Sequence, residues 1–279
     1  MKRFIETFRN LAVLGILLAC WTLVPQLAGA KDGLVQVVRD IDHTRYETLL
    51  KKFVDDRGLV NYADWKSSPE DLRVLIDYTD SFAATGPWAI GDERVASLIN
   101  AYNALTLRFI LELYPTESIR ELNDPFGKRR HEVGGRRVSL DDIEHQTLRP
   151  LAGYRVHAAL VCAARSCPPL RREAFRPESL DTQLNDAMRI WLARDDLNSF
   201  VPDERVDRIS SIFRWFGEDF REAGGLDRVL VRHGPAEAMA LFQQRRVDIE
   251  YLDYNWGLND QGGLGTDYKR SLWKKLFGN

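Results

Sequence analysis

The segment from Asp92 to Tyr114 places the strongest constraint on how this 279-residue chain can fold. Its apolar side chains are spread around the whole circumference of a helix: Val95, Leu98, Ile99, Tyr102, Leu105, Leu107, Phe109, Ile110, Leu111 and Leu113. A helix that is apolar on every side is stable only when other elements cover it. We therefore expect this helix at the centre of the molecule, ending before Pro115, which cannot continue its hydrogen bonding.

Shorter elements are predicted before and after the central helix. Apolar residues at helical spacing predict helices over Thr44–Val54, Glu70–Phe82, Leu180–Ala193, Ile209–Phe220 and Pro235–Gln244. Alternating or uniformly apolar runs predict strands or extended pieces at Leu59–Tyr62, Val156–Val161 and Val247–Leu252. This mixed order favours an α+β fold, a single domain in which the buried central helix packs on a small sheet.

Turn and capping residues predict a further unit just after the central helix. A Gly-Gly turn predicts a hairpin between His131–Val133 and Arg136–Val138. Ser139 then caps a helix that ends near Pro150, and Asp142 completes a pattern like a capping box. This helix carries two of the candidate site residues discussed below.

The first thirty residues predict a secretory signal peptide, followed by one globular domain over residues 31–279. A basic start leads into an apolar run from Leu11 to Trp21, which is shorter than the roughly 20 residues of a membrane span. Ala28-Gly29-Ala30 then supplies the small residues of a cleavage site before Lys31. We expect a periplasmic or secreted protein. Two alternatives stay open: an uncleaved N-terminal anchor, and a lipoprotein modified at Cys20.

The charge of the chain excludes one class of partner. The whole sequence has a net charge of −2, and the predicted leader carries three basic side chains against one acidic, so the remainder is near −4. Nucleic-acid binders and proteins held by anionic lipid carry an excess of basic residues. We therefore expect no nucleic-acid partner and, after cleavage, no stable membrane span.

Two cysteines, Cys162 and Cys167, remain after the predicted cleavage, which removes Cys20. An even number of cysteines in an oxidising compartment favours a disulfide. Closing so short a loop would contribute at most about 2–3 kcal/mol to stability on the loop-length model. The alternative is a free, reactive thiol.

The parts of a cysteine-nucleophile site occur close together in the sequence. Cys167 is the candidate nucleophile, and His157 is the candidate base that takes its proton. Glu144 or His145 is the candidate orienting group. On a strand, His157 would face away from Cys162, which makes Cys167 its better partner. The structural alternative is a disulfide beside a hydrogen-bonded core histidine.

Asn100 and Asn103 share one face of the central helix, and Tyr102 lies between them. A buried amide without partners costs about 1–3 kcal/mol, so each asparagine must find partners. The three residues are candidate binding residues that form a polar floor beneath a pocket, where an asparagine could donate to an oxyanion. The structural alternative is that the amides bond loop backbone and fix the helix in place.

No metal and no cofactor are expected. The sequence lacks His-Glu-x-x-His, paired Cys-x-x-Cys motifs, a phosphate-binding loop and a dinucleotide fingerprint. Both cysteines with His145 and His157 could supply four zinc ligands. Their spacing, however, matches no familiar zinc pattern.

Four blocks of sequence, taken in order, resemble the family named domain of unknown function 547. The blocks are Leu98–Leu105, Ser139–His145 with Leu148-Arg149, Arg155–Cys162 with Ser166–Leu170, and Ile249–Asn259. The last block departs from the expected pattern at Asn255 and Gly257, where we expect Asp and Ser. The resemblance implies a single domain and places the candidate residues inside family motifs. It implies no reaction, because none is established for the family.

Two functions are compatible with these residues. The first is an exported thiol-dependent hydrolase or transferase that acts on peptide-like or amide substrates. The second is a non-catalytic periplasmic binding or assembly module in which Cys162 and Cys167 form a structural disulfide. Geometry separates them, because the enzyme needs an imidazole nitrogen within hydrogen-bond reach of the Cys167 sulfur.

The leader prediction fixes the mature N-terminus. When a bacterial host exports the protein, the mature chain should begin at Lys31, because Ala28 and Ala30 fit the small pockets of signal peptidase. N-terminal sequencing of the exported protein measures this directly. A lipid-modified Cys20 at the N-terminus would contradict the prediction and place the protein on a membrane.

Overall fold

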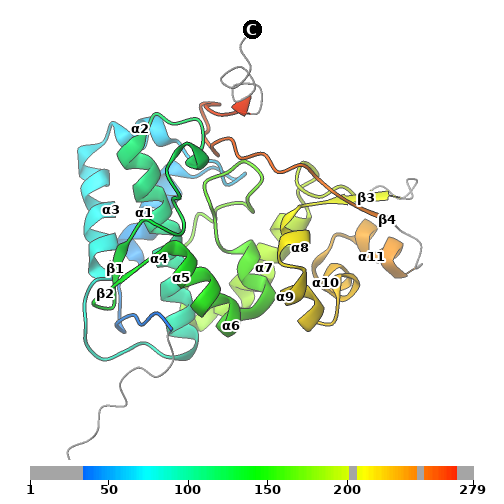
Figure 1. Ribbon diagram of the computed structural model, residues 1–279, viewed down its shortest axis with the longest axis horizontal. Helices are drawn as coiled ribbons and strands as arrows, with labels where there is room; N and C mark the ends of the chain where they lie inside the picture. The colour runs from blue at the N-terminus through cyan, green and yellow to red at the C-terminus, as the bar shows by residue number, and fades with distance from the viewer. Residues whose placement is uncertain (1–33, 201–205, 244–247, 269–279) are drawn as a thin grey trace, which may run out of the picture. The chain divides into compact units, whose positions relative to one another are not determined.

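The computed structural model describes residues 34–200, 206–243 and 248–268 (Figure 1). The predicted signal peptide, residues 1–30, lies outside this range. From Leu34 onwards the described residues form one compact unit. The fold class is α+β, as predicted, because helices dominate and the strands form small two-stranded sheets.

The predicted central helix is α4, Gly91–Leu113. Every residue from Val95 to Leu107 is buried, including the polar ones, because other elements cover the helix on all sides. Its neighbours include α2 (Tyr62–Lys66), α3 (Pro69–Ser81), α5 (Leu140–Ile143) and the short turn η4 (Pro177–Ser179). The prediction of a buried central helix, made from its apolar side chains on every side, is therefore confirmed.

Helix α1, Thr44–Phe53, packs on α3, which in turn packs on α4. Tyr46 of α1 stacks on Tyr78 of α3 with ring centroids 4.6 Å apart. Phe53 stacks on Trp65 of α2 at 4.7 Å. Such stacked pairs stabilise a core beyond the area they bury. Both α1 and α3 match their predicted ranges to within one residue.

The C-terminal half is built from short helices (Figure 1). They are α6 (Arg149–Ala152), α7 (Leu180–Leu192), α8 (Ile212–Trp215), α9 (Gly217–Glu222), α10 (Leu226–His233) and α11 (Ala236–Gln243). None of the described helices, α4 included, has both the length and the apolar content needed to cross a bilayer.

The strands form two separate pairs. β1 (His131–Val133) and β2 (Arg136–Val138) are antiparallel, as predicted, and the two glycines of their turn have φ of 57° and 70°. Glycine adopts such positive values without steric cost, which is why the turn needs it. β3 (Val206–Ile209) pairs in parallel with β4 (Asp248–Tyr251).

The strand predicted at Val156–Val161 is wrong. Residues Gly153–Ala158 form the 3-10 turn η3, and the chain then continues irregularly. The side chain of Asn103 explains the difference, because it donates to the carbonyl of Ala159 and accepts from the N–H of Val161, each at 2.9 Å. One side chain thus satisfies backbone groups that would otherwise need a partner strand.

Two other predicted elements differ from the structure. The extended piece predicted at Leu59–Tyr62 runs into α2, because Asn61 caps that helix by accepting from the N–H of Asp64 at 3.1 Å. The helix predicted over Ile209–Phe220 is divided between the end of β3, α8 and α9. Gly217, a poor helix former, stands at the break between α8 and α9.

Replacing Asn103 with leucine tests its place in the fold. The change leaves the Ala159 carbonyl and the Val161 N–H without hydrogen-bond partners, so the free energy of unfolding should fall by about 1–3 kcal/mol. Urea unfolding measures this, with Asn123→Leu at an exposed loop position as the control. If Asn103→Leu were as stable as the wild type, the double hydrogen bond would have no structural role.

Candidate functional site

Most of the sequence-predicted site residues meet at one cavity of about 210 Å³. From the predicted set, the cavity is lined by Tyr102, Glu144, His145, His157 and Cys167. The remaining walls include Cys162 and the aromatic residues Trp215, Phe216, Tyr254 and Trp256. The fold therefore brings α4, the segment after β2 and the C-terminal part of the chain to the same place.

Asn100 and Asn103 do not belong to the described lining of this cavity. Asn100 donates to the carbonyl of Phe175 at 2.8 Å and accepts from the N–H of the same residue at 2.9 Å. Asn103 makes the equivalent pair of bonds to the segment after η3. Both amides therefore hold loop backbone against α4, which corresponds to the structural alternative.

Glu144 brings a poorly solvated carboxylate to the cavity. It begins the π-helical turn η2, Glu144–Leu148, directly after α5, whose predicted capping box is confirmed. Such turns are frequent at functional sites. Tyr102 donates its hydroxyl hydrogen to Glu144 Oε2 at 3.0 Å. Burial nevertheless raises the pKa of Glu144 above its usual 4.5, so its ionised form lacks full compensation for lost water.

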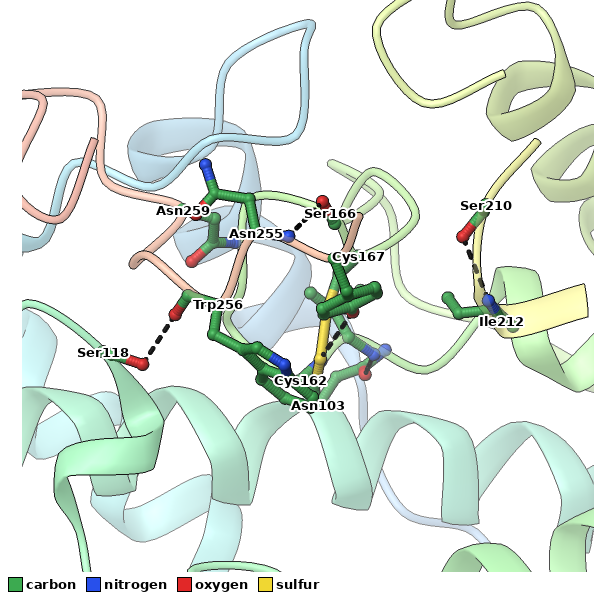
Figure 2. The surroundings of a disulfide bond; sticks show 12 residues. Asn103, Ser118, Cys162, Ser166, Cys167, Ser210, Ile212, Asn255, Trp256 and Asn259 are labelled. Carbon is green, nitrogen blue, oxygen red and sulfur yellow. Dashed lines mark hydrogen bonds between the residues drawn. A yellow bond between two sulfur atoms is a disulfide. The ribbon is translucent and has the colours of Figure 1, made fainter. Parts of the chain in front are cut away.

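Aromatic rings form a second part of the cavity wall. The rings of Tyr254 and Trp256 lie 4.6 Å apart, and those of Trp215 and Tyr254 lie 4.8 Å apart, measured between centroids. Ser118 holds Trp256 by donating to its carbonyl at 2.6 Å (Figure 2). Trp215 is 45% exposed, which places a large apolar ring between the cavity and solvent.

Cys162 and Cys167 are joined by a disulfide at the cavity wall (Figure 2). The hydroxyl of Tyr254 lies 3.2 Å from each sulfur, and the N–H of Cys162 donates to Cys167 Sγ at 3.1 Å. The N–H of Asn255 donates to Ser166 Oγ at 2.8 Å and ties the loop to the C-terminal segment. Cys167 is therefore oxidised, whereas the cysteine-nucleophile hypothesis requires its free thiol.

His157 is hydrogen-bonded to the carboxylate of Asp219, a residue that the sequence patterns did not indicate. Its Nε2–H donates to Asp219 Oδ2 at 2.7 Å, and its ring stacks on Phe216 with centroids 4.1 Å apart. Arg149 binds both oxygens of Asp219 at 2.8 Å, and these hydrogen bonds are the main reason why the pKa of Asp219 is lowered to about 2. Burial lowers the pKa of His157 to about 4 in spite of Asp219. At neutral pH, His157 is therefore an uncharged hydrogen-bond donor.

His145 is exposed beside the acidic part of the cavity. Its Nε2 lies 3.7 Å from Asp141 and its Nδ1 lies 3.8 Å from Glu144. Within the described part of the chain, no hydrogen bond joins His145 or His157 to a sulfur. The same residues contain no group of three or more His, Cys, Asp or Glu side chains arranged to hold a metal ion.

Comparison with known families places the site in context. Residues 88–192 match the family model described as protein of unknown function, DUF547. The match confirms the resemblance to this family over these residues. The match contains Glu144, His157 and both cysteines of the cavity, whereas Trp215 and Tyr254 lie outside it. No curated protein and no solved structure matches the chain.

Sequence reasoning missed part of this site for identifiable reasons. Asp219 lies 62 residues after His157, and no local pattern connects the two. Trp215 and Phe216 fell within a predicted helix and were indistinguishable from core residues. Tyr254 lies in the last resemblance block, Ile249–Asn259, where no pattern distinguishes a site residue; it is buried and contacts both sulfurs.

The lowered pKa of His157 predicts a pH dependence of stability. In the unfolded chain His157 takes up a proton near its usual 6.5, whereas in the fold it does so only near 4. The contribution of uncharged His157 to the free energy of unfolding is complete above pH 6.5 and is lost as the pH falls from 6.5 to 4. At pH 5 this loss amounts to about 2 kcal/mol.

Urea unfolding at pH 7.5 and pH 5 measures the effect. His157→Gln, which keeps a donor toward Asp219, should lose less stability between these pH values than the wild type does. His145→Gln is the control, because it changes an exposed imidazole in the same cavity. If His157→Gln and the wild type lost equal stability between the two pH values, His157 would not be the cause of the pH dependence.

Proposed function

We propose that this protein is an exported binding module whose cavity takes a small organic cation at the carboxylate of Glu144. The observation that carries the proposal is a carboxylate of raised pKa, only 13% exposed, inside a cavity walled by Trp215, Tyr254 and Trp256. Aromatic faces attract cations, and most strongly those that have lost their water. The carboxylate supplies the opposite charge that a desolvated cation needs.

The charged side chains that line the cavity favour a cation over an anion. Glu144 and Asp141 are acidic, and burial is the main cause that raises the pKa of each. No lysine or arginine occurs among the described residues of the lining. A bound cation would therefore relieve an unfavourable buried charge. The volume of about 210 Å³ suits a compact ligand.

Export is part of the proposal and rests on the leader-like residues 1–30. The disulfide supports it, because disulfides form and persist in oxidising compartments such as the periplasm. We therefore propose that the ligand is met in the periplasm or outside the cell.

The thiol-dependent hydrolase or transferase has weaker support. Its four candidate residues line the same cavity, which is in its favour. Cys167, however, is bonded to Cys162, and the Nε2 of His157 donates to Asp219. Attack on a peptide-like or amide substrate would need both interactions to break first. Cation binding needs neither change.

Three ligands of similar size test whether the cavity prefers a cation. Benzylammonium, benzyl alcohol and benzoate share a ring and differ in charge. Benzylammonium should bind at least about tenfold more tightly than benzyl alcohol, and benzoate should bind most weakly, because only the cation gains from Glu144. Isothermal titration calorimetry measures the affinities, and tryptophan fluorescence gives a second readout.

Substitution and pH provide the controls. Glu144→Gln should abolish the preference for the cation, whereas Glu70→Gln, at an exposed carboxylate of α3, should retain it. In the wild type, affinity for benzylammonium should fall as the pH drops through the pKa of Glu144, in a range above that of an ordinary glutamate. Equal affinity for the three ligands would reject the proposal.

A further inference from the structure

We propose that the Cys162–Cys167 disulfide is reactive and exchanges with a thiol that enters the cavity. Both cysteines belong to the cavity lining, so a ligand held there lies beside the residues of the disulfide. This activity goes beyond ligand binding, because the cavity would then recognise a substrate and the disulfide would oxidise it.

The loop does not depend on the disulfide for its position. The two cysteines are only five residues apart, and so short a loop restricts the unfolded chain little. Asn103 holds the backbone before the loop. Within the loop, the N–H of Arg165 donates to Gly257 at 2.8 Å, and Ser166 and Asn255 exchange two hydrogen bonds. The reduced protein should therefore keep its fold.

The two sulfurs differ in access and in hydrogen bonding, which gives the exchange a direction. Cys167 is 5% exposed, whereas Cys162 is only partly buried, so an incoming thiolate reaches the sulfur of Cys162. The N–H of Cys162 donates to Cys167 Sγ and so distinguishes the two sulfurs, whereas the hydroxyl of Tyr254 lies 3.2 Å from both. Both donors would stabilise a departing thiolate, because hydrogen bonds to charged groups are the stronger ones.

The exchange balances as two successive displacements. The substrate thiol first loses its proton to water, since the thiolate is the nucleophile. It forms a bond to the sulfur of Cys162 while the disulfide breaks, and the electron pair goes to Cys167. A second thiol of the same class, which also loses its proton to water, then attacks the substrate sulfur and releases Cys162 as a thiolate, and both cysteine thiolates take up protons from water. Two substrate thiols are thereby oxidised to one disulfide, and the protein disulfide is reduced to two thiols.

The structure also points to the charge of the preferred thiol, and this step rests on the proposed cation site. Glu144, Tyr254 and both cysteines line the same cavity, so the charge of Glu144 lies near the disulfide. That charge also adds to burial, the main cause, in raising the pKa of Tyr254, whose hydroxyl contacts both sulfurs. A negative charge opposes both an incoming and a departing thiolate. A thiol that carries an ammonium group neutralises it, so the substrate class is small aminothiols.

Three small thiols test the exchange and its charge preference together. The folded, exported protein is treated with cysteamine, 2-mercaptoethanol or 3-mercaptopropionate, quenched in acid, alkylated and analysed by mass spectrometry. Circular dichroism shows in parallel that the fold persists. Per thiolate present, cysteamine should open the disulfide about tenfold faster than 2-mercaptoethanol, and 3-mercaptopropionate should be slowest. Glu144→Gln should remove these differences.

Variants of the two cysteines and of Tyr254 test the direction of attack. Cys167→Ala should form a mixed disulfide with cystamine at Cys162, whereas Cys162→Ala should react at least about tenfold more slowly at the buried Cys167. Tyr254→Phe should slow opening by cysteamine roughly tenfold, because the leaving thiolate loses one donor.

The outcomes separate the two proposals. A disulfide that opens only when circular dichroism shows unfolding, or a Cys162→Ala variant that reacts faster than Cys167→Ala, would overturn the exchange. A mixed disulfide at Cys162 combined with equal rates for the three thiols would leave the exchange in place. That result would overturn the aminothiol preference and the cation site on which it rests.

Discussion

The two hydrogen bonds of the Asn103 side chain are the interaction on which the rest of the site depends. They hold the backbone of Ala159 and Val161 against the most buried part of α4, and this segment leads directly to Cys162. The preceding residue, Tyr102, holds Glu144 from the same helical turn. One fully buried turn of α4 therefore positions both the carboxylate and the disulfide. Enclosure makes these bonds obligatory, since a buried amide without partners is costly.

The ionisable groups near the cavity are of two kinds. Asp219 is fully engaged by Arg149 and His157, its pKa is lowered, and the group braces the wall formed by Phe216. Glu144 is different, because one hydrogen bond from Tyr102 does not offset its burial and its pKa is raised. Perturbed carboxylates of this second kind, when they lie in a cavity, are typical of functional sites.

Local sequence patterns predicted the elements whose structure is decided locally. The all-round apolar run of α4, the Gly-Gly hairpin and the capping box before Glu144 lie where the sequence indicated. The strand at Val156–Val161 failed because an apolar run does not reveal that the distant Asn103 satisfies its backbone. Long-range pairs were missed for the same reason: Asp219 meets His157 only in the fold. The family match, over residues 88–192, likewise ends before the aromatic wall.

The pKa of the Glu144 carboxyl is the most direct measure of whether the cavity is built for a cation. Carbon-13 NMR of the labelled side chain, titrated with and without benzylammonium and compared with Glu144→Gln for assignment, gives this value. The account predicts a pKa above 4.5 in the free protein and a lower pKa when benzylammonium is bound, because the cation compensates the carboxylate charge. A pKa at or below 4.5, unchanged by the cation, would contradict it.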